Sequence, residues 1–383
     1  MPNFPVKKIA ILINPQGSSG VPGGICVVVT KLLQGLDSRN FELDLVVQSA
    51  EAVRLFPEIP SQVRIINLNT QFQVRFKSAI KIISPLSKYL KKEKPDVLIC
   101  HLTLVNYLTV IARFFTKYPT HLILVEHFPF LELQKQLATN KKGFIKAPLQ
   151  FMQRWLYLQA DAIVAVSQGV AKSFEVGLGL SPGSVKVIYN PVVDKKLLHK
   201  AETPLENSWF AENQPPVILT VGRLLPPKDF STLIQAFAQL RKKRPLRLLI
   251  LGEGDLRPKL ESLIAKLGID KDVSLPGYTS NPYSYMAKSA VFVLSSNFEG
   301  LPTVMIEALA CNCQVVATNC PYGPKEILAD GEFGRLIPVG DVSALAKAME
   351  LALDKPLSIE KLKQRSGNFT VESSVDSYLK LLV

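Results

Sequence analysis

The stretch that decides the fold is residues 289–310, SAVFVLSSNFEGLPTVMIEALA. Residues 290–294 form a short apolar, partly β-branched run, which is typical of a buried parallel strand. Residues 296–300 are polar and include a glycine, so we expect the chain to leave the sheet there. Leu301-Pro302-Thr303 then opens a helix, because proline suits the first helical position, where no N–H is needed.

A strand, a tight loop and a helix N-terminus together form a natural phosphate site. The first N–H groups of a helix lack partners, and its dipole is positive at that end. Two carboxylates flank this site, Glu299 in the loop and Glu307 about one turn into the helix. A carboxylate repels phosphate but accepts hydrogen bonds from neighbouring hydroxyls. The arrangement therefore predicts a ligand with a sugar on each side of a diphosphate, which is a nucleotide sugar.

The block EGLPTVMIE resembles the E-x7-E motif of the retaining family 4 glycosyltransferases, which have the GT-B fold. The resemblance implies that Glu299 contacts the transferred sugar and that Glu307 contacts the nucleotide ribose. It also implies donor contacts at the residues between them, namely Gly300, Leu301, Pro302 and Thr303. The alternative from the residues alone is a helix-capping acid followed by an exposed helical acid.

A second motif supplies positive charge. Gly222 and Arg223 follow the expected strand 217–221, and Lys228 comes five residues later. Arginine binds phosphate through two parallel N–H donors and lysine binds it as a point charge, so together they can neutralise a diphosphate. The segment VGRLLPPKDFSTLIQAF resembles the donor-phosphate motif of the same family, which implies this role for Arg223 and Lys228. Surface basic residues in a loop are the alternative.

We expect no metal site. The one D-x-D sequence, at 270–272, lies between a helix and a strand and has the character of a solvated turn. The five cysteines are too few and too scattered for a disulfide framework, which favours a reducing compartment. Cys311, Cys313 and Cys320 are expected to be buried small residues rather than zinc ligands.

Further donor contacts come from the resemblance. The segment LGEGDLRPKLE is similar to the family's G-x-G segment, in which Gly252 and Gly254 allow a tight turn near the nucleotide. Tyr278 follows the turn where relatives hold the base, against the alternative of ordinary turn packing.

In the first half, His127 follows the expected strand 121–126, and relatives contact the transferred sugar with a histidine there. A structural histidine is the alternative. His101 likewise follows a strand, and Ser167, after the expected strand 162–166, is a weaker cleft candidate. A loop with Gly17, Gly20, Gly23 and Gly24 follows the first strand. Its spacing matches neither a P-loop nor a dinucleotide fingerprint. We expect Gly24 or its neighbours to approach the donor.

The chain has 383 residues, enough for two domains of similar size. Strands and helices alternate in both halves, which predicts two Rossmann-like, doubly wound parallel-sheet domains facing a cleft. We place the acceptor-binding domain at 1–195, a polar linker at 195–216, and the nucleotide-sugar domain at 196–365. The last helix, within about 366–383, is expected to return to the first domain as in GT-B proteins. The expected strands are 6–14, 41–48, 63–68, 96–100, 121–126, 162–166 and 185–189, then 217–221, 246–251, 273–275, 290–294 and 314–318.

The net charge lies entirely in the first half. Residues 1–200 hold 25 Lys+Arg and 12 Asp+Glu, a surplus of 13, and the remainder balances at 45−25 = 20 against 32−12 = 20. Two basic stretches that carry aromatic residues, 72–94 and 135–157, suit an anionic membrane surface. Solvated helix faces are the alternative. With no targeting or spanning segment expected, we predict a cytoplasmic protein, peripheral on the membrane, that binds no nucleic acid.

The sequence thus predicts a retaining, metal-independent glycosyltransferase without a cofactor. Its substrates are expected to be a nucleotide sugar, with a UDP-sugar favoured, and a glycan acceptor that is lipid-linked. Two alternatives stay open: a nucleotide-sugar epimerase on the same fold, and a non-catalytic partner subunit. An epimerase would isomerise the donor alone, and a partner subunit has no need of Arg223, Lys228, Glu299 and Glu307 together.

Overall fold

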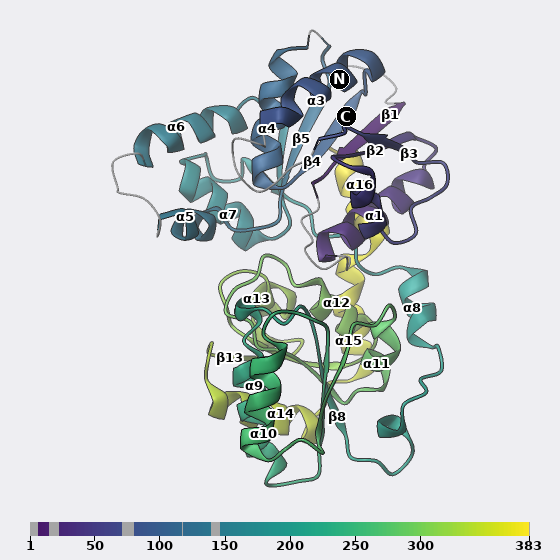
Figure 1. Ribbon diagram of the computed structural model, residues 1–383, viewed down its shortest axis with the longest axis vertical. Coiled ribbons are helices and arrows are strands. Elements are labelled where there is room, and N and C mark those ends of the chain that lie inside the picture. Colours follow the sequence, from purple (N-terminus) through teal and green to yellow (C-terminus); the bar gives the residue numbers. More distant parts are fainter. Residues whose placement is uncertain (1–6, 15–22, 71–79, 117, 139–145, 383) are drawn as a thin grey trace. The chain divides into compact units, whose positions relative to one another are not determined.

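A computed structural model describes residues 7–14, 23–70, 80–116, 118–138 and 146–382 of the chain (Figure 1). It divides into two compact units. One comprises residues 1–191 together with 371–383, and the other comprises residues 192–370. The units are described separately below.

The first unit is built on a seven-stranded sheet in the order β3-β2-β1-β4-β5-β6-β7, in which every pairing is parallel. The strands are Lys8–Leu12 (β1), Glu42–Val47 (β2), Arg64–Asn67 (β3), Val97–His101 (β4), His121–Glu126 (β5), Ala162–Ala165 (β6) and Val185–Val187 (β7). The inner strands β1, β2, β4, β5 and β6 consist mostly of buried Val, Ile, Leu and Ala, as expected for a sheet covered on both faces, whereas the edge strands β3 and β7 are more exposed. The strand order reverses direction between β1 and β4, which is the ligand-binding point of such sheets.

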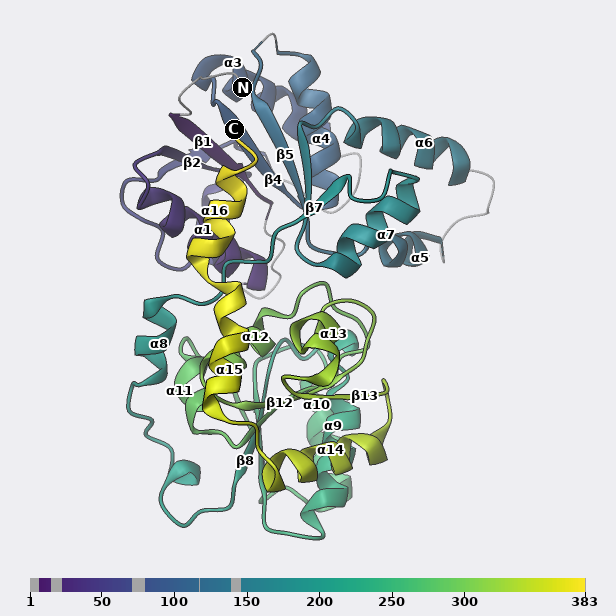
Figure 2. The same ribbon diagram turned by 180° about the vertical axis from the view of Figure 1, so that it is seen from behind.

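Helices cover both faces of this sheet. They are Gly24–Asp37 (α1), Ile83–Glu93 (α3), Thr103–Phe114 (α4), Phe130–Ala138 (α5), Lys146–Tyr157 (α6), Gln168–Leu178 (α7) and Val371–Leu379 (α16). The C-terminal α16 packs along α1, at the opposite end of the sequence (Figure 2). Gly35 makes this contact close, because a Cβ there would lie 2.6 Å from Val375 Cγ2 and 2.7 Å from Val371 Cγ1.

The second unit repeats the same design. Its six-stranded parallel sheet has the order β10-β9-β8-β11-β12-β13, so the direction reverses between β8 and β11. The strands are Val217–Val221 (β8), Arg247–Leu251 (β9), Val273–Gly277 (β10), Val291–Leu294 (β11), Gln314–Thr318 (β12) and Arg335–Ile337 (β13).

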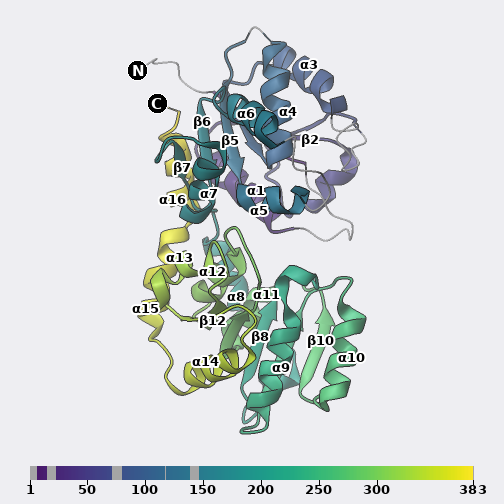
Figure 3. The same ribbon diagram turned by 90° about the vertical axis from the view of Figure 1, so that its left-hand side faces the viewer.

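Two groups of helices sandwich the second sheet (Figure 3). Phe230–Arg241 (α9), Arg257–Leu267 (α10) and Val342–Asp354 (α14) build one core layer against the sheet, with Phe237 fully buried among them. The other helices are Lys195–Ala201 (α8), Pro282–Lys288 (α11), Thr303–Ala310 (α12), Pro324–Ile327 (α13) and Ile359–Ser366 (α15). Of these, α12 packs against α11 and α15 and also contacts β11 and β12.

The predicted fold class is confirmed, with two doubly wound parallel sheets. The linker expected at 195–216 is wrong, because this segment is an ordered part of the second unit. Asp194 Oδ1 accepts a hydrogen bond from Leu197 N at 2.6 Å and caps α8, and α8 packs on α11. The division of the chain falls instead between Pro191 and Val192. The prediction missed α8 because a seven-residue helix shows too few turns for a periodic pattern.

Packing of α16 on α1 gives a first test. Glycine to alanine inside a helix ordinarily stabilises a protein by about 0.5–1 kcal/mol. Gly35→Ala should instead destabilise by about 1–3 kcal/mol, since two stiff valines must move. Urea unfolding of the full chain measures the change. Gly367→Ala is the matched control, because no atom of the residues that the structure describes lies within 4 Å of its Cβ position. A stabilised Gly35→Ala would contradict this packing.

Candidate active site

An ion pair in the second unit joins the loops that follow β8 and β11. Lys228 Nζ lies 2.6 Å from Glu299 Oε1, with the side chains 26% and 12% exposed. Because β8 and β11 flank the reversal of strand order, the ion pair occupies the expected ligand-binding edge of this sheet. The structure therefore brings together two residues that lie 71 positions apart and that the sequence placed in separate motifs.

Hydroxyl groups and backbone bonds fix both loops. Ser296 Oγ donates to Glu299 Oε1 at 2.7 Å, and Thr318 Oγ1 donates to the Ser296 carbonyl at 2.6 Å. Ser295 Oγ donates to the carbonyl of Lys228 at 2.8 Å, which holds one loop against the other. Glu299 is thus positioned by a cation and a hydroxyl before any ligand binds.

The N-terminus of α12 opens directly beyond this pair. Its N-cap is Pro302, which has no side-chain acceptor, and among the described residues no side chain caps this end, so it suits a phosphate. Gly323 supports the turn from the neighbouring loop, at φ +89°. A Cβ there would lie 2.5 Å from Pro302 Cδ and 3.0 Å from the Gly300 carbonyl.

Glu307 lies within α12 and is only 7% exposed. It is therefore no ordinary exposed helical acid. Burial and then the charge of Glu307 raise the pKa of Tyr283, which begins the first turn of α11. Tyr283 is thus a neutral hydroxyl near Glu307 that the sequence did not point to, because nothing in its local pattern distinguishes it from a packing tyrosine.

Backbone hydrogen bonds connect the loops that follow β8, β9 and β10. Gly222 N donates to the Leu251 carbonyl at 2.9 Å, and Gly252 N donates to the Gly277 carbonyl at 2.8 Å. Gly252 has φ +141°, and a Cβ there would lie 2.0 Å from the Gly222 oxygen, so no other residue fits. Gly254, at φ +158°, meets the backbone of Leu224 in the same way.

Two predicted donor residues are exposed at this edge. Tyr278, just after β10, is 51% exposed. Arg223 is also exposed, and within the part of the chain that the structure describes no hydrogen bond or ion pair links it to Lys228 or Glu299. The guanidinium is therefore not committed to either of these groups.

In the first unit, two histidines meet at the carboxyl ends of β4 and β5. His101 Nδ1 lies 2.8 Å from His127 Nε2, and both rings are buried, at 1% and 5% exposure. Desolvation lowers the pKa of His127 to about 4, and desolvation together with the neighbouring ring lowers the pKa of His101. Both imidazoles are therefore neutral near pH 7, and His127 acts as a hydrogen-bonding group rather than as a cation.

The neighbouring Glu126 is fully buried and was not predicted as a functional residue. Its carboxylate accepts hydrogen bonds from Thr103 Oγ1 at 2.6 Å, from Asn106 Nδ2 at 2.6 Å and from the Tyr157 hydroxyl. Burial outweighs these donors and raises the pKa of Glu126 to about 7. The carboxyl group links β5 to α4 and α6, directly beside His127.

Two other residues predicted for the site, Gly24 and Ser167, lie at the N-termini of helices in the first unit. Gly24 begins α1, but residues 15–22, which hold Gly17 and Gly20, lie outside the described residues. Ser167 is fully buried, and its Oγ accepts from Val170 N at 3.2 Å, so it caps α7.

The described residues include no group of three or more His, Cys, Asp or Glu side chains arranged to hold a metal ion. The cysteines of the second unit are buried thiols, and burial with the nearby Glu299 raises the pKa of Cys320 to about 12. Within the same described residues, no helix has the length and apolar character needed to cross a membrane.

The chain thus consists of two doubly wound α/β units, and in the second unit a Lys–Glu pair lies beside the N-terminus of α12 at the switch point of the sheet. Family models place the chain accordingly. "Glycosyl transferases group 1" matches residues 203–369, and "Glycosyltransferase Family 4" matches residues 22–196.

Similar proteins support this assignment. An N-acetylgalactosamine-N,N'-diacetylbacillosaminyl-diphospho-undecaprenol 4-alpha-N-acetylgalactosaminyltransferase of Campylobacter jejuni is 31% identical over 91% of each chain. A second enzyme of that organism, a GalNAc-alpha-(1->4)-GalNAc-alpha-(1->3)-diNAcBac-PP-undecaprenol alpha-1,4-N-acetyl-D-galactosaminyltransferase, is 26% identical over 98% of each. The chain belongs to the group 1 glycosyltransferases of GT-B type, and it is a glycosyltransferase.

Solved structures agree on the fold. Sucrose-phosphate synthase from Thermosynechococcus elongatus superposes with a TM-score of 0.78 at 20% identity, covering 98% of both chains. Anabaena HepE in complex with UDP gives a TM-score of 0.76 at 19% identity, covering 98% of this chain and 99% of HepE.

Glu126 predicts a pH dependence of stability. Because its folded pKa is raised from 4.5 to about 7, the folded state binds the proton more tightly. The stability that Glu126 contributes is thus present below pH 4.5 and is lost as pH rises through 7. Relative to Glu126→Gln, the wild type should lose about 2–3 kcal/mol between pH 5 and pH 8. Urea unfolding at several pH values measures this loss. Any contribution of His101 and His127 is common to both proteins and cancels in the comparison. A difference that does not vary with pH would show that the carboxyl is not desolvated.

Proposed function

We propose that this glycosyltransferase moves a hexosyl group, with retention of anomeric configuration, from a nucleotide sugar to a lipid-linked glycan acceptor in polysaccharide or glycan assembly. The Lys228–Glu299 pair beside the uncapped N-terminus of α12 is the observation that carries this proposal. It puts a cation and a hydroxyl-binding carboxylate next to a phosphate site, which matches the order of groups in a sugar diphosphate.

The donor-binding roles follow from this edge. Lys228, Arg223 and the N-terminus of α12 stabilise the diphosphate, and they do so most strongly as it becomes the leaving group. Glu299 accepts hydrogen bonds from hydroxyls of the transferred sugar, and Glu307 binds the ribose. Gly222, Gly252, Gly300 and Leu301 let backbone approach the nucleotide, and Tyr278 contacts the base.

Retention needs no enzyme nucleophile in this scheme. The bond from the anomeric carbon to the diphosphate oxygen breaks while the bond to the acceptor oxygen forms on the same face. The proton of the acceptor hydroxyl goes to the departing diphosphate oxygen. Cationic side chains take the place of a metal ion in stabilising that oxygen, so neither a metal nor another cofactor is included. His127, neutral through burial, donates or accepts a hydrogen bond at the transferred sugar.

The proposals for the acceptor and for the donor's base are supported by the similar proteins. Both Campylobacter relatives are named as acting on undecaprenyl-diphosphate-linked glycans, and HepE was solved with UDP. A UDP-sugar is therefore the first donor to test. The surplus charge of 13 in residues 1–200 suits an anionic membrane that carries such an acceptor, with the protein peripheral on its cytoplasmic side.

Removing the free guanidinium tests the phosphate site. Arg223→Ala should lower kcat/KM for glycosyl transfer by a factor on the order of 100, because a charge-assisted contact contributes about 3 kcal/mol. Arg244→Ala is the matched control, since Arg244 is a partly exposed arginine paired with Asp354 on the same unit. Turnover of Arg223→Ala near that of the wild type would remove Arg223 from the mechanism.

A donor panel identifies the nucleotide. In thermal unfolding with UDP-, GDP- and ADP-sugars, the true donor should raise Tm, because binding to the folded state stabilises it. Glu307→Gln should weaken the shift, since the ribose hydroxyls lose a charged acceptor. Incubation of the stabilising donor alone should leave its sugar unchanged, and isomerised sugar would indicate an epimerase instead. No shift with any donor, at concentrations that saturate related enzymes, would contradict the proposal.

A further inference from the structure

Helix α6 exposes its apolar side. Its inner face buries Gln153, Leu156 and Tyr157, whereas its outer face presents large hydrophobic side chains to solvent. The exposed fractions on that outer face are Phe151 73%, Met152 47%, Trp155 45% and Leu158 56%. A surface helix normally turns polar residues to solvent, whereas the solvent-facing side of α6 carries large hydrophobic residues.

The neighbouring α4 extends the same surface. Phe114, at its end, stacks on Trp155 with ring centroids 5.4 Å apart and planes 7° from parallel. Phe114 and Phe115 are nevertheless 54% and 61% exposed. We call this surface the α4–α6 face, made of Phe114, Phe115, Phe151, Met152, Trp155 and Leu158. Scattered exposed hydrophobic residues are ordinary, but six on and beside two neighbouring helices, joined by the Phe114–Trp155 stack, mark an interaction site.

The charge of the surrounding segments favours an anionic partner. Residues 97–161 contain seven basic residues and three acids, of which Asp161 pairs with Arg113 and Glu126 is buried, so this stretch of the chain is net positive. Anionic lipid headgroups attract such segments, whereas a protein partner of ordinary mixed charge has no reason to require them.

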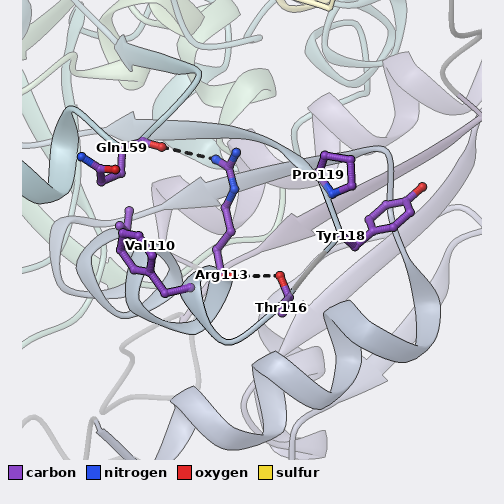
Figure 4. A pocket seen from close by; sticks show the side chains of 7 residues that line it. Val110, Arg113, Thr116, Tyr118, Pro119 and Gln159 are labelled. Atoms are coloured by element: carbon purple, nitrogen blue, oxygen red, sulfur yellow. Dashed lines mark hydrogen bonds between the residues drawn. The ribbon is translucent and has the colours of Figure 1, made fainter.

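A pocket of about 270 Å³ lies beside Phe114, lined by Arg113, Thr116, Tyr118 and Gln159 among others (Figure 4). Arg113 Nη1 lies 2.8 Å from Asp161 Oδ2 and donates to the Gln159 carbonyl. Because Asp161 neutralises this guanidinium, the pocket presents little net charge to a phosphate. Its contribution is a polar border to the α4–α6 face.

We propose that the α4–α6 face docks on the interfacial layer of an anionic membrane, with Phe151, Trp155 and Phe115 in the headgroup region. Tryptophan and phenylalanine beside basic residues are the side chains that interfacial helices use. The purpose of the contact, bringing the enzyme to a lipid-linked acceptor, rests on the proposed function, but the contact itself does not.

The position of the face within the first unit fits this use. In a parallel sheet, α4 runs back from the end of β4 and α6 runs toward the start of β6. Phe114 and Trp155 lie at or near the C-terminal ends of these helices, so they flank the amino edge of the strands. The histidine pair lies at the opposite, carboxyl edge. Docking therefore leaves the predicted sugar-binding edge uncovered.

Flotation of the full chain with vesicles tests the contact. The wild type should float with vesicles of phosphatidylcholine and phosphatidylglycerol, and far less with phosphatidylcholine alone. Phe115→Ser/Phe151→Ser should reduce the bound fraction at least about tenfold, because two exposed aromatic anchors are lost. Val176→Ser, which removes a 62% exposed valine from α7 of the same unit, is the matched control and should float normally.

Fluorescence gives a second readout. The chain has two tryptophans, so Trp209→Phe leaves Trp155 as the one tryptophan emitter. Its emission should shift to the blue on adding anionic vesicles and should be quenched by brominated lipid. Unchanged emission together with normal flotation of the serine variant would overturn the proposal.

A second copy of the chain is the competing occupant. Sedimentation velocity of the wild type and of Phe115→Ser/Phe151→Ser separates the two. A wild-type dimer that the substitutions dissociate, without any vesicle binding, would assign the face to self-association and overturn the proposal. The donor-induced Tm shift should be equal in wild type and variant, so loss of lipid binding is distinguishable from failure of the proposed transfer.

Discussion

The ion pair between Lys228 and Glu299 is the constraint on which the second unit's chemistry depends. Two opposite charges, each more than half buried, must stay together at 2.6 Å because separating them leaves an uncompensated charge away from water. The pair therefore holds the loops after β8 and β11 in one arrangement, with Ser295 and Ser296 closing it. A ligand with a diphosphate enters a site whose cation is already oriented.

The two units differ in how they stabilise the polar side chains at the ends of their strands. The second unit keeps charged groups and offsets them in pairs. The first unit buries Glu126, His101 and His127 so deeply that desolvation drives them toward neutrality. A neutral edge suits contact with uncharged sugar hydroxyls, whereas a charged one suits phosphate.

Local pattern accounts for most of the framework. The predicted bounds of β5, β8 and β12 coincide with those of the structure, because each is an apolar run with an abrupt polar boundary. Short elements were not predicted, because β13 has three residues and α8 has seven, which is too few to show a periodic pattern. Of the site, Lys228 and Glu299 were identified in advance, whereas Ser296, Tyr283, His101's hydrogen bond to His127 and the Glu126 cluster depend on contacts between distant segments.

The sequence alone therefore determined the class of fold, the strand–loop–helix unit at residues 289–310 and the basic first half, because local spacing and composition record all three. Only the tertiary structure decided that α16 returns to α1 and that Glu307 is buried. It also decided that the aromatic side of α6 faces solvent beside Phe114. The physical reason is that burial depends on which distant side chains pack together, and a one-dimensional pattern records only how residues repeat along the chain.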